Sequence, residues 1–165
     1  MTIHNVIGDC LNDAPCLKRK IIAHICNDCG GWGSGFVVNL SKVYPQAEEA
    51  YRKWHTFESY KIGETSIPFA LGNIQVVPVD KSFVCVINMI AQHNTISTDP
   101  GSKPIRYAAL ASCMTKTANI CRKLNGEFHI PRIGSVLAGG RWDFIEELIN
   151  EIWGEFDVYI YTLPS

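Results

Sequence analysis

The sequence lacks a charge excess of either sign, a long apolar run and the usual nucleotide-binding signatures. Its 165 residues carry 15 Lys and Arg against 16 Asp and Glu, which gives a formal net charge of −1. Proteins that hold nucleic acid by neutralising many phosphates need a basic excess or a basic face, so general nucleic-acid binding is not expected. The apolar runs are shorter than the roughly 18 residues that span a bilayer, so we expect no membrane segment.

The cysteines do not form a disulfide framework or a recognisable metal motif. There are seven of them, an odd number, and the first residues show no signal-peptide pattern, which favours a reducing, cytoplasmic location. Cys26 and Cys29 form a CxxC pair, but no second pair or nearby histidine pair completes a zinc site. We therefore predict neither a metal site nor a cofactor. The sequence gives no indication of the oligomeric state.

The sequence does contain the pattern of one α/β domain over residues 1–165. Hydrophobic residues make up 47% and charged residues 19%, which is enough apolar surface for a sizeable core. Short apolar, β-branched runs bounded by turn residues predict strands over 3–7, 20–26, 67–71, 74–79, 83–89, 128–133 and 158–163.

Apolar spacing of three and four residues predicts helices between these strands. Two of them cover 107–121 and 142–152. A third begins at Phe36 and is broken or restarted by Pro45, after which a short helix continues to Trp54. Strands alternating with helices predict a three-layer α/β/α sandwich with a central mixed β-sheet.

Two glycine-rich loops, at 29–35 and 134–140, each follow a predicted strand and precede a predicted helix. Such a loop lets backbone N–H groups approach an anion at the positive end of a helix dipole. Neither loop matches GxGxxG or the phosphate-loop pattern. Each loop alone is compatible with a plain turn. Two such loops at one sheet edge could bind a diphosphate between them, because ligands of such sheets bind beyond the carboxyl ends of the strands.

Seven short segments carry a family resemblance in their order and spacing. They are Gly8-Asp9-Cys10, IAHICNDCGGWGSGF at 22–36, Tyr44-Pro45-Gln46-Ala47, Leu71-Gly72-Asn73-Ile74-Gln75, Ile87-Asn88-Met89-Ile90-Ala91-Gln92, Pro104-Ile105-Arg106-Tyr107 and IPRIGSVLAGGRWD at 130–143. Together they resemble the macro domain, in the branch that includes ADP-ribose 1''-phosphate phosphatases of yeast and phage type. The resemblance covers nearly the whole chain. It implies the macro domain fold and a pocket for ADP-ribose or ADP-ribose 1''-phosphate.

The resemblance also implies roles for single residues in that pocket. Asp9 would accept a hydrogen bond from the adenine amino group, and the Cys10 N–H would donate to a ring nitrogen. This pair of an acceptor and a donor selects adenine. The alternative role for Asp9 is that of a turn residue. Asn27 would face the distal ribose. The other implied ligand-binding residues are Gly33, Ser34, Gly35 and Phe36 of the first loop, and Ile133, Gly134, Ser135, Val136, Leu137, Ala138 and Gly139 around the second, which would cradle the diphosphate. Phe36 is nearly as compatible with the core.

Departures from the family favour phosphate removal. Hydrolases that cleave ADP-ribose from proteins commonly carry Asp where this chain has Val37. A second hydrolase branch uses a Lys near the end of the central strand, absent from 87–92 here, and an Asp in the second loop, where this chain has Ala138. The chain is therefore predicted to be an enzyme, a phosphatase that converts ADP-ribose 1''-phosphate to ADP-ribose and phosphate without a metal. The alternatives are a non-catalytic ADP-ribose-binding module, or a hydrolase that removes ADP-ribose from modified protein or nucleic acid.

Phosphate removal needs a positioned water, donors to the phosphoryl oxygens and a proton for the leaving oxygen. We predict that Asn27 orients the ribose and water, that Asp28 acts as general base, and that His24 or His93 serves as acid, base or phosphate donor. Each has a structural alternative: His24 as a core histidine, Asp28 as an exposed loop carboxylate and His93 as a surface loop residue. Trp32 is either a lid over the ligand or a packing anchor.

Overall fold

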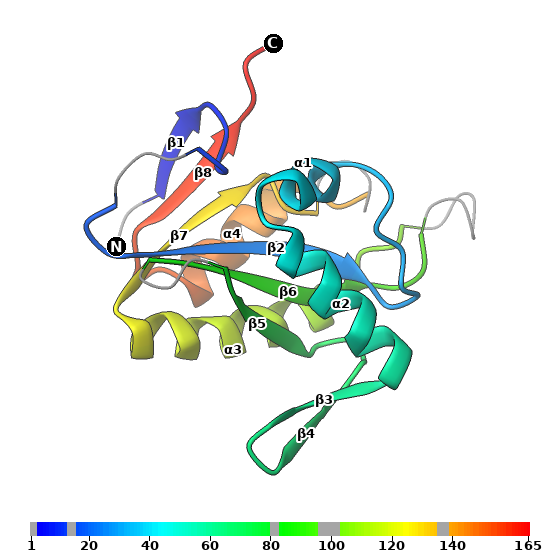
Figure 1. The fold of residues 1–165 in the computed structure, drawn as a ribbon. Helices are drawn as coiled ribbons and strands as arrows, with labels where there is room; N and C mark the ends of the chain where they lie inside the picture. The colour runs from blue at the N-terminus through cyan, green and yellow to red at the C-terminus, as the bar shows by residue number, and fades with distance from the viewer. Residues whose placement is uncertain (1–2, 13–15, 80–82, 96–102, 135–138) are drawn as a thin grey trace.

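The computed structural model describes residues 3–12, 16–79, 83–95, 103–134 and 139–165, which form a three-layer α/β/α sandwich (Figure 1). Six strands make the central sheet, in the order β1-β8-β7-β2-β6-β5. β5 pairs antiparallel with β6 and the other neighbouring pairs are parallel, so the predicted mixed sheet is confirmed. The strands are β1 (Ile3–Ile7), β2 (Arg19–Asn27), β5 (Ile74–Pro78), β6 (Val84–Gln92), β7 (Gly126–Pro131) and β8 (Val158–Thr162).

Helices cover both faces of the sheet. α1 (Phe36–Val43) and α2 (Pro45–Phe57) lie on one face, and α3 (Tyr107–Leu124) and α4 (Trp142–Ile152) lie on the other (Figure 1). The predicted break at Pro45 is present, because proline begins α2, where its missing N–H leaves no intrahelical bond unmade. Within the described part of the chain, no helix combines the length and the apolar character needed to cross a bilayer.

A small hairpin departs from the prediction. The sequence pattern predicted one strand over 67–71, whereas the chain forms β3 (Ser59–Ile62) paired antiparallel with β4 (Thr65–Pro68). Neither strand has a buried residue, so the hairpin offers little apolar periodicity for a sequence reading to detect.

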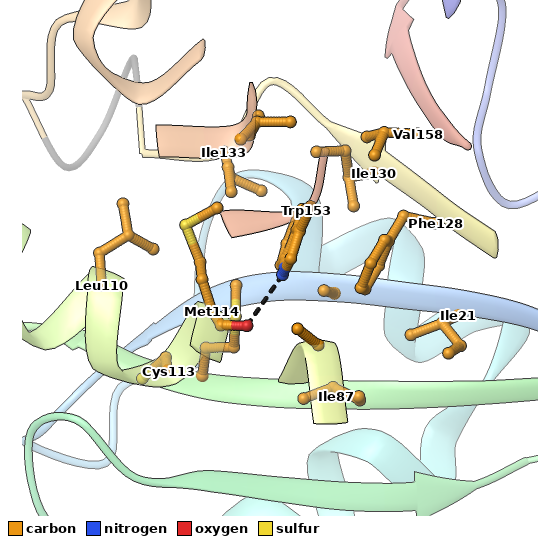
Figure 2. Close-up of a cluster of buried hydrophobic side chains, with 14 of the residues drawn as sticks. Ile21, Ile87, Leu110, Cys113, Met114, Phe128, Ile130, Ile133, Trp153 and Val158 are labelled. Atoms are coloured by element: carbon orange, nitrogen blue, oxygen red, sulfur yellow. Dashed lines mark hydrogen bonds between the residues drawn. The ribbon is translucent and has the colours of Figure 1, made fainter. Parts of the chain in front are cut away.

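The core on the α3 and α4 side is built from apolar side chains (Figure 2). The ring of Trp153 stacks on that of Phe128 with 4.0 Å between centroids, and its Nε1 donates to the Met114 carbonyl at 2.9 Å. All three residues are fully buried. A polar indole group is thereby satisfied without interrupting the apolar packing.

One edge of the sheet gathers the segments that the sequence marked as functional. β1, β2, β6 and β7 run parallel within the sheet, so their carboxyl ends share that edge. After these ends come Asp9 and Cys10, the first glycine loop, His93 and the second glycine loop, respectively. Ser135, Val136, Leu137 and Ala138 of the second loop lie outside the described residues.

Candidate functional site

Asn27, the last residue of β2, holds the first glycine loop in shape. Its Oδ1 accepts hydrogen bonds from the Gly31 N–H at 2.9 Å and the Cys29 N–H at 3.1 Å, and its Nδ2 donates to the Gly31 carbonyl at 2.8 Å. The Tyr51 hydroxyl on α2 lies 2.8 Å from Oδ1 and 2.7 Å from the Asn27 carbonyl. Burial raises the pKa of Tyr51 well above its usual range, so the hydroxyl remains a donor. The Asn27 amide is therefore engaged within the loop and its support.

His24 lies beneath this loop in the core. It is 2% exposed, its Nε2 lies 2.5 Å from Asn88 Oδ1, and Trp32 meets its ring edge-on with 5.4 Å between centroids. Burial lowers the pKa of His24 to about 4, only partly opposed by the hydrogen bond to Asn88, so the ring is neutral near pH 7. Trp32 is itself buried and donates from Nε1 to Ser41 Oγ at 2.6 Å, an arrangement typical of a packing anchor.

Asp28 and His93 form a hydrogen-bonded pair at the carboxyl ends of β2 and β6. Asp28 Oδ2 lies 2.7 Å from His93 Nδ1, and Asp28 Oδ1 accepts the Asn94 N–H at 2.8 Å. Asp28 has an 18% exposed side chain and His93 a 47% exposed one, so the imidazole faces solvent from a partly buried carboxylate. An ionised carboxylate only accepts, so Nδ1 carries the proton and Nε2 of the neutral ring keeps a lone pair. Asn94 Nδ2 lies 3.2 Å from that nitrogen.

The start of the second glycine loop requires glycine. Gly134 has φ +72°, and a Cβ there would lie 2.7 Å from Ile105 Cδ1 and 2.9 Å from Ile25 Cδ1. The loop closes on itself through a 2.7 Å hydrogen bond from the Gly140 N–H to the Gly134 carbonyl. Ile133 is 3% exposed and packs in the apolar core, so a ligand would meet its backbone rather than its side chain.

Lys103 lies against the second loop and directly precedes a residue that contacts His93, and the sequence analysis did not predict it. The following residue, Pro104, accepts the His93 N–H at 2.8 Å. Lys103 is exposed, and its side chain lies against Gly139, with Cγ 3.4 Å from where a Cβ would stand. A cation beside a glycine loop suits a phosphate group. The available signal was its position directly before the Pro104-Ile105-Arg106-Tyr107 segment.

The remaining predicted residues lie along the same edge. Asp9 is exposed and its Oδ1 accepts the Leu11 N–H at 2.9 Å, a turn that its side chain stabilises; the neighbouring Cys10 is buried. The exposed segment Gly33-Ser34-Gly35 leads into the N-terminus of α1, whose free N–H groups favour an anion. Phe36 is half-buried, with its ring 5.8 Å from that of His24, so it borders both the loop and the core.

Comparison with known proteins assigns this architecture to a family. A macrodomain protein from Streptomyces coelicolor is 37% identical and superposes with a TM-score of 0.78, over 98% of this chain and 99% of that one. The chain belongs to the macrodomain family. The family resemblance and the three-layer fold expected from the sequence are thus confirmed.

Two further relatives of this macrodomain match it over nearly full length. A Bacteroides thetaiotaomicron protein of unknown function is 40% identical with a TM-score of 0.85, over 98% of each chain. An ADP-ribose 1''-phosphate phosphatase from Lodderomyces elongisporus is 25% identical, over 97% of this chain and 99% of that protein. No protein-family profile matches the chain.

Proposed function

We propose that this macrodomain is a phosphatase that converts ADP-ribose 1''-phosphate to ADP-ribose and inorganic phosphate. The observation that carries the proposal is the Asp28–His93 pair, 2.7 Å apart and open to solvent, at the sheet edge where the two glycine loops begin. The name of the Lodderomyces relative supports the same substrate. The exposed residues Gly33, Ser34 and Gly35 lead into the N-terminus of α1, whose backbone N–H groups favour an anion.

The ligand would lie along the carboxyl edge of the sheet. Asp9 and the Cys10 N–H would receive adenine after β1, and the second loop from Gly134 to Gly139 would hold the diphosphate. Lys103, which contacts Gly139, would offset phosphate charge there. The distal ribose and its 1''-phosphate would then extend toward the first loop, where His93 is exposed.

The chemistry follows from the hydrogen-bond pattern of the pair. Asp28 holds the proton on His93 Nδ1, so Nε2, once water replaces the Asn94 amide that lies 3.2 Å from it, can take a proton from that water while the water oxygen attacks phosphorus. The bond between phosphorus and the 1'' oxygen breaks, and that oxygen takes up a proton from solvent, which leaves ADP-ribose and inorganic phosphate. His93 Nε2 then returns its proton to solvent. Preorganised backbone N–H donors of the first loop would stabilise the charge that spreads over the phosphoryl oxygens.

Two of the predicted catalytic residues fit a positioning role better. The His24 ring is buried and neutral beneath Trp32, and the Asn27 amide is occupied by its own loop. Both would act by fixing the backbone that carries Asp28 and the glycines. Asn27→Ala should therefore weaken ligand binding together with turnover.

The test is a chromatographic assay of purified protein with ADP-ribose 1''-phosphate, following ADP-ribose and free phosphate. Wild type should form both products. Asp28→Asn should lose activity by about 100-fold or more while still binding ADP-ribose, because the amide no longer fixes the proton on Nδ1 of His93, the general base. Substrate bound without product would contradict the proposal in favour of a binding module. Release of ADP-ribose from a modified protein or nucleic acid, with no attack on the phosphate, would contradict it in favour of a hydrolase.

A further inference from the structure

A second group of reactive side chains lies away from the carboxyl edge. Glu127 and His129 are two residues apart on β7 and so point to the same face of the sheet, and Cys16 approaches them from the segment before β2. One ligand-type atom from each lies within 4.8 Å of the others. Glu127 and His129 are buried, and Cys16 is half-buried. Because Glu127 is at the amino end of β7, this group is distinct from the proposed phosphatase site.

The contacts among these three side chains differ from those of a nucleophilic triad. Cys16 Sγ and Glu127 Oε1 both approach the same ring nitrogen, His129 Nε2, at 3.7 Å and 3.6 Å. In a nucleophilic triad the acid would bind the opposite nitrogen, but His129 Nδ1 instead lies 2.7 Å from the Tyr161 hydroxyl. Burial also raises the pKa of the Cys16 thiol, with Glu127 adding to the shift, which opposes a free thiolate nucleophile.

The same distances suit three ligands around one ion. Zn–S bonds of about 2.3 Å and Zn–N or Zn–O bonds of about 2.0–2.2 Å at tetrahedral angles place ligand atoms roughly 3.4–3.6 Å apart. A hydrogen bond from the distal ring nitrogen to a neighbouring oxygen, as His129 Nδ1 has with Tyr161, is the usual device that orients a metal-bound histidine. The ring of His129 is further fixed by stacking on Tyr159, 4.7 Å between centroids.

We propose that Cys16, Glu127 and His129 bind a divalent zinc ion. Thiolate, imidazole and carboxylate together form a borderline-soft set that selects Zn²⁺ over Mg²⁺ or Ca²⁺. The fourth position would take water, because Cys16 is only half-buried. The ion would tie the segment before β2 to β7, a structural role separate from the proposed phosphatase chemistry.

The charges around the group fit a cation. Lys20, the cross-strand partner of Glu127, is a buried positive charge near the group. Its Nζ donates to the Asn12 carbonyl at 2.9 Å. Burial and the Asp157 carboxylate raise the Glu127 pKa, whereas Lys18 and His4 also lie close enough to lower it. Three negative charges, on Glu127, Asp157 and a deprotonated Cys16, therefore face the positive charges of Lys20 and Lys18.

The test uses Co²⁺ and Zn²⁺ alone with the full chain after treatment with a chelator. Co²⁺ gives a near-ultraviolet charge-transfer band only when a thiolate ligates it, so wild type should show this band at one equivalent and lose it when Zn²⁺ is added. Cys16→Ser should lose the band and bind Zn²⁺ at least about 10-fold more weakly. The matched control is Cys29→Ser, which removes the exposed cysteine of the first glycine loop and should behave as wild type.

Glu127→Gln provides a second variant that keeps the thiolate. It should retain the band with weaker Zn²⁺ affinity, and Zn²⁺ should raise its unfolding temperature less than it raises that of wild type. The proposal would be overturned by wild type without the band, or by a band that survives in Cys16→Ser and disappears in Cys29→Ser. Zn²⁺ binding that is equal in wild type, Cys16→Ser and Glu127→Gln would overturn it equally.

Discussion

The two faces of the central strand β2 are built differently. Toward α3 and α4, Ile21 and Ala23 pack into a large apolar cluster. Toward α1 and α2, Ile22 and Cys26 join a smaller apolar cluster, and beside it buried polar groups form a chain. Gln75 Oε1 accepts from Asn88 Nδ2 at 3.0 Å, and Asn88 Oδ1 lies 2.5 Å from His24 Nε2. The apolar face supplies burial energy, whereas the polar face fixes the orientation of the strand that carries the candidate site.

The largest expected effect comes from opening the apolar face. Phe128→Ala removes a fully buried ring that stacks on Trp153 and should lower the free energy of unfolding by about 3–5 kcal/mol. Urea denaturation measures the loss. Because Phe128 faces away from the site, the folded fraction should retain ADP-ribose binding. A loss below about 1 kcal/mol would contradict the packing described for this face.

The next largest effect is a pH dependence of the free energy of unfolding, which arises from His24 on the polar face. Below pH 6.5 the unfolded chain protonates His24, while the folded chain excludes that proton until about pH 4, so stability falls as the pH falls across this window. The loss from this one group is on the order of 3 kcal/mol. Unfolding free energies measured from pH 7 to 4 should therefore decrease less steeply in His24→Asn than in wild type. Parallel curves would contradict the assignment.

A smaller effect is expected from removing a single buried hydroxyl, and two tyrosines distinguish a loss of stability from a loss of ligand binding. Tyr51→Phe removes the hydroxyl that contacts Asn27 and should cost about 1–2 kcal/mol of stability and weaken ADP-ribose binding. The matched control is Tyr60→Phe, which loses a hydroxyl bond to the Ile74 carbonyl at 2.6 Å, between β3 and β5, neither of which carries a candidate site residue. It should cost a similar stability and leave binding, measured by calorimetry, unchanged. Equal affinities in the two variants would contradict a positioning role for Tyr51.

The smallest effect should come from the solvent side of α2. Lys53 and Glu49 form an ion pair at 3.0 Å in which both side chains are about two-thirds exposed, so Lys53→Ala should change the unfolding free energy by less than about 0.5 kcal/mol. Thermal melts at low and high salt provide the measurement. A larger loss would show that α2 depends on its surface charges rather than on its packing against the sheet.

Much of the fold was predictable because its signals are local. Six of the seven predicted strands match the strands of the central sheet within a few residues, and helical spacing located the four helices that the described residues form. The missed hairpin strand, Ser59–Ile62, has no buried residue and hence no apolar pattern. The order of the strands in the sheet depends on pairings between distant segments, which local patterns do not encode.

The candidate site was predictable as a set of residues but not as a set of contacts. Asp28 and His93 were separate candidates, and their pairing joins the ends of two strands 65 residues apart. The bond from Tyr51 to Asn27 arises only when α2 packs on β2. The proposed zinc ligands were not predictable from the spacing of cysteines and histidines, because Cys16 is far from His129 in the sequence. Glu127 and His129 share a face only because they are two residues apart in a strand.

The most direct test of the proposed function compares two histidines that are each paired with an aspartate. His93 pairs with Asp28 at the carboxyl edge, and His4 pairs with Asp157 at 3.1 Å at the amino ends of β1 and β8. We predict that His93→Asn lowers kcat/KM for ADP-ribose 1''-phosphate by about 100-fold or more, with ADP-ribose affinity nearly unchanged, and that His4→Asn turns over like wild type. Equal turnover by the two variants would contradict the account, as would a wild-type protein that binds the substrate and releases no phosphate.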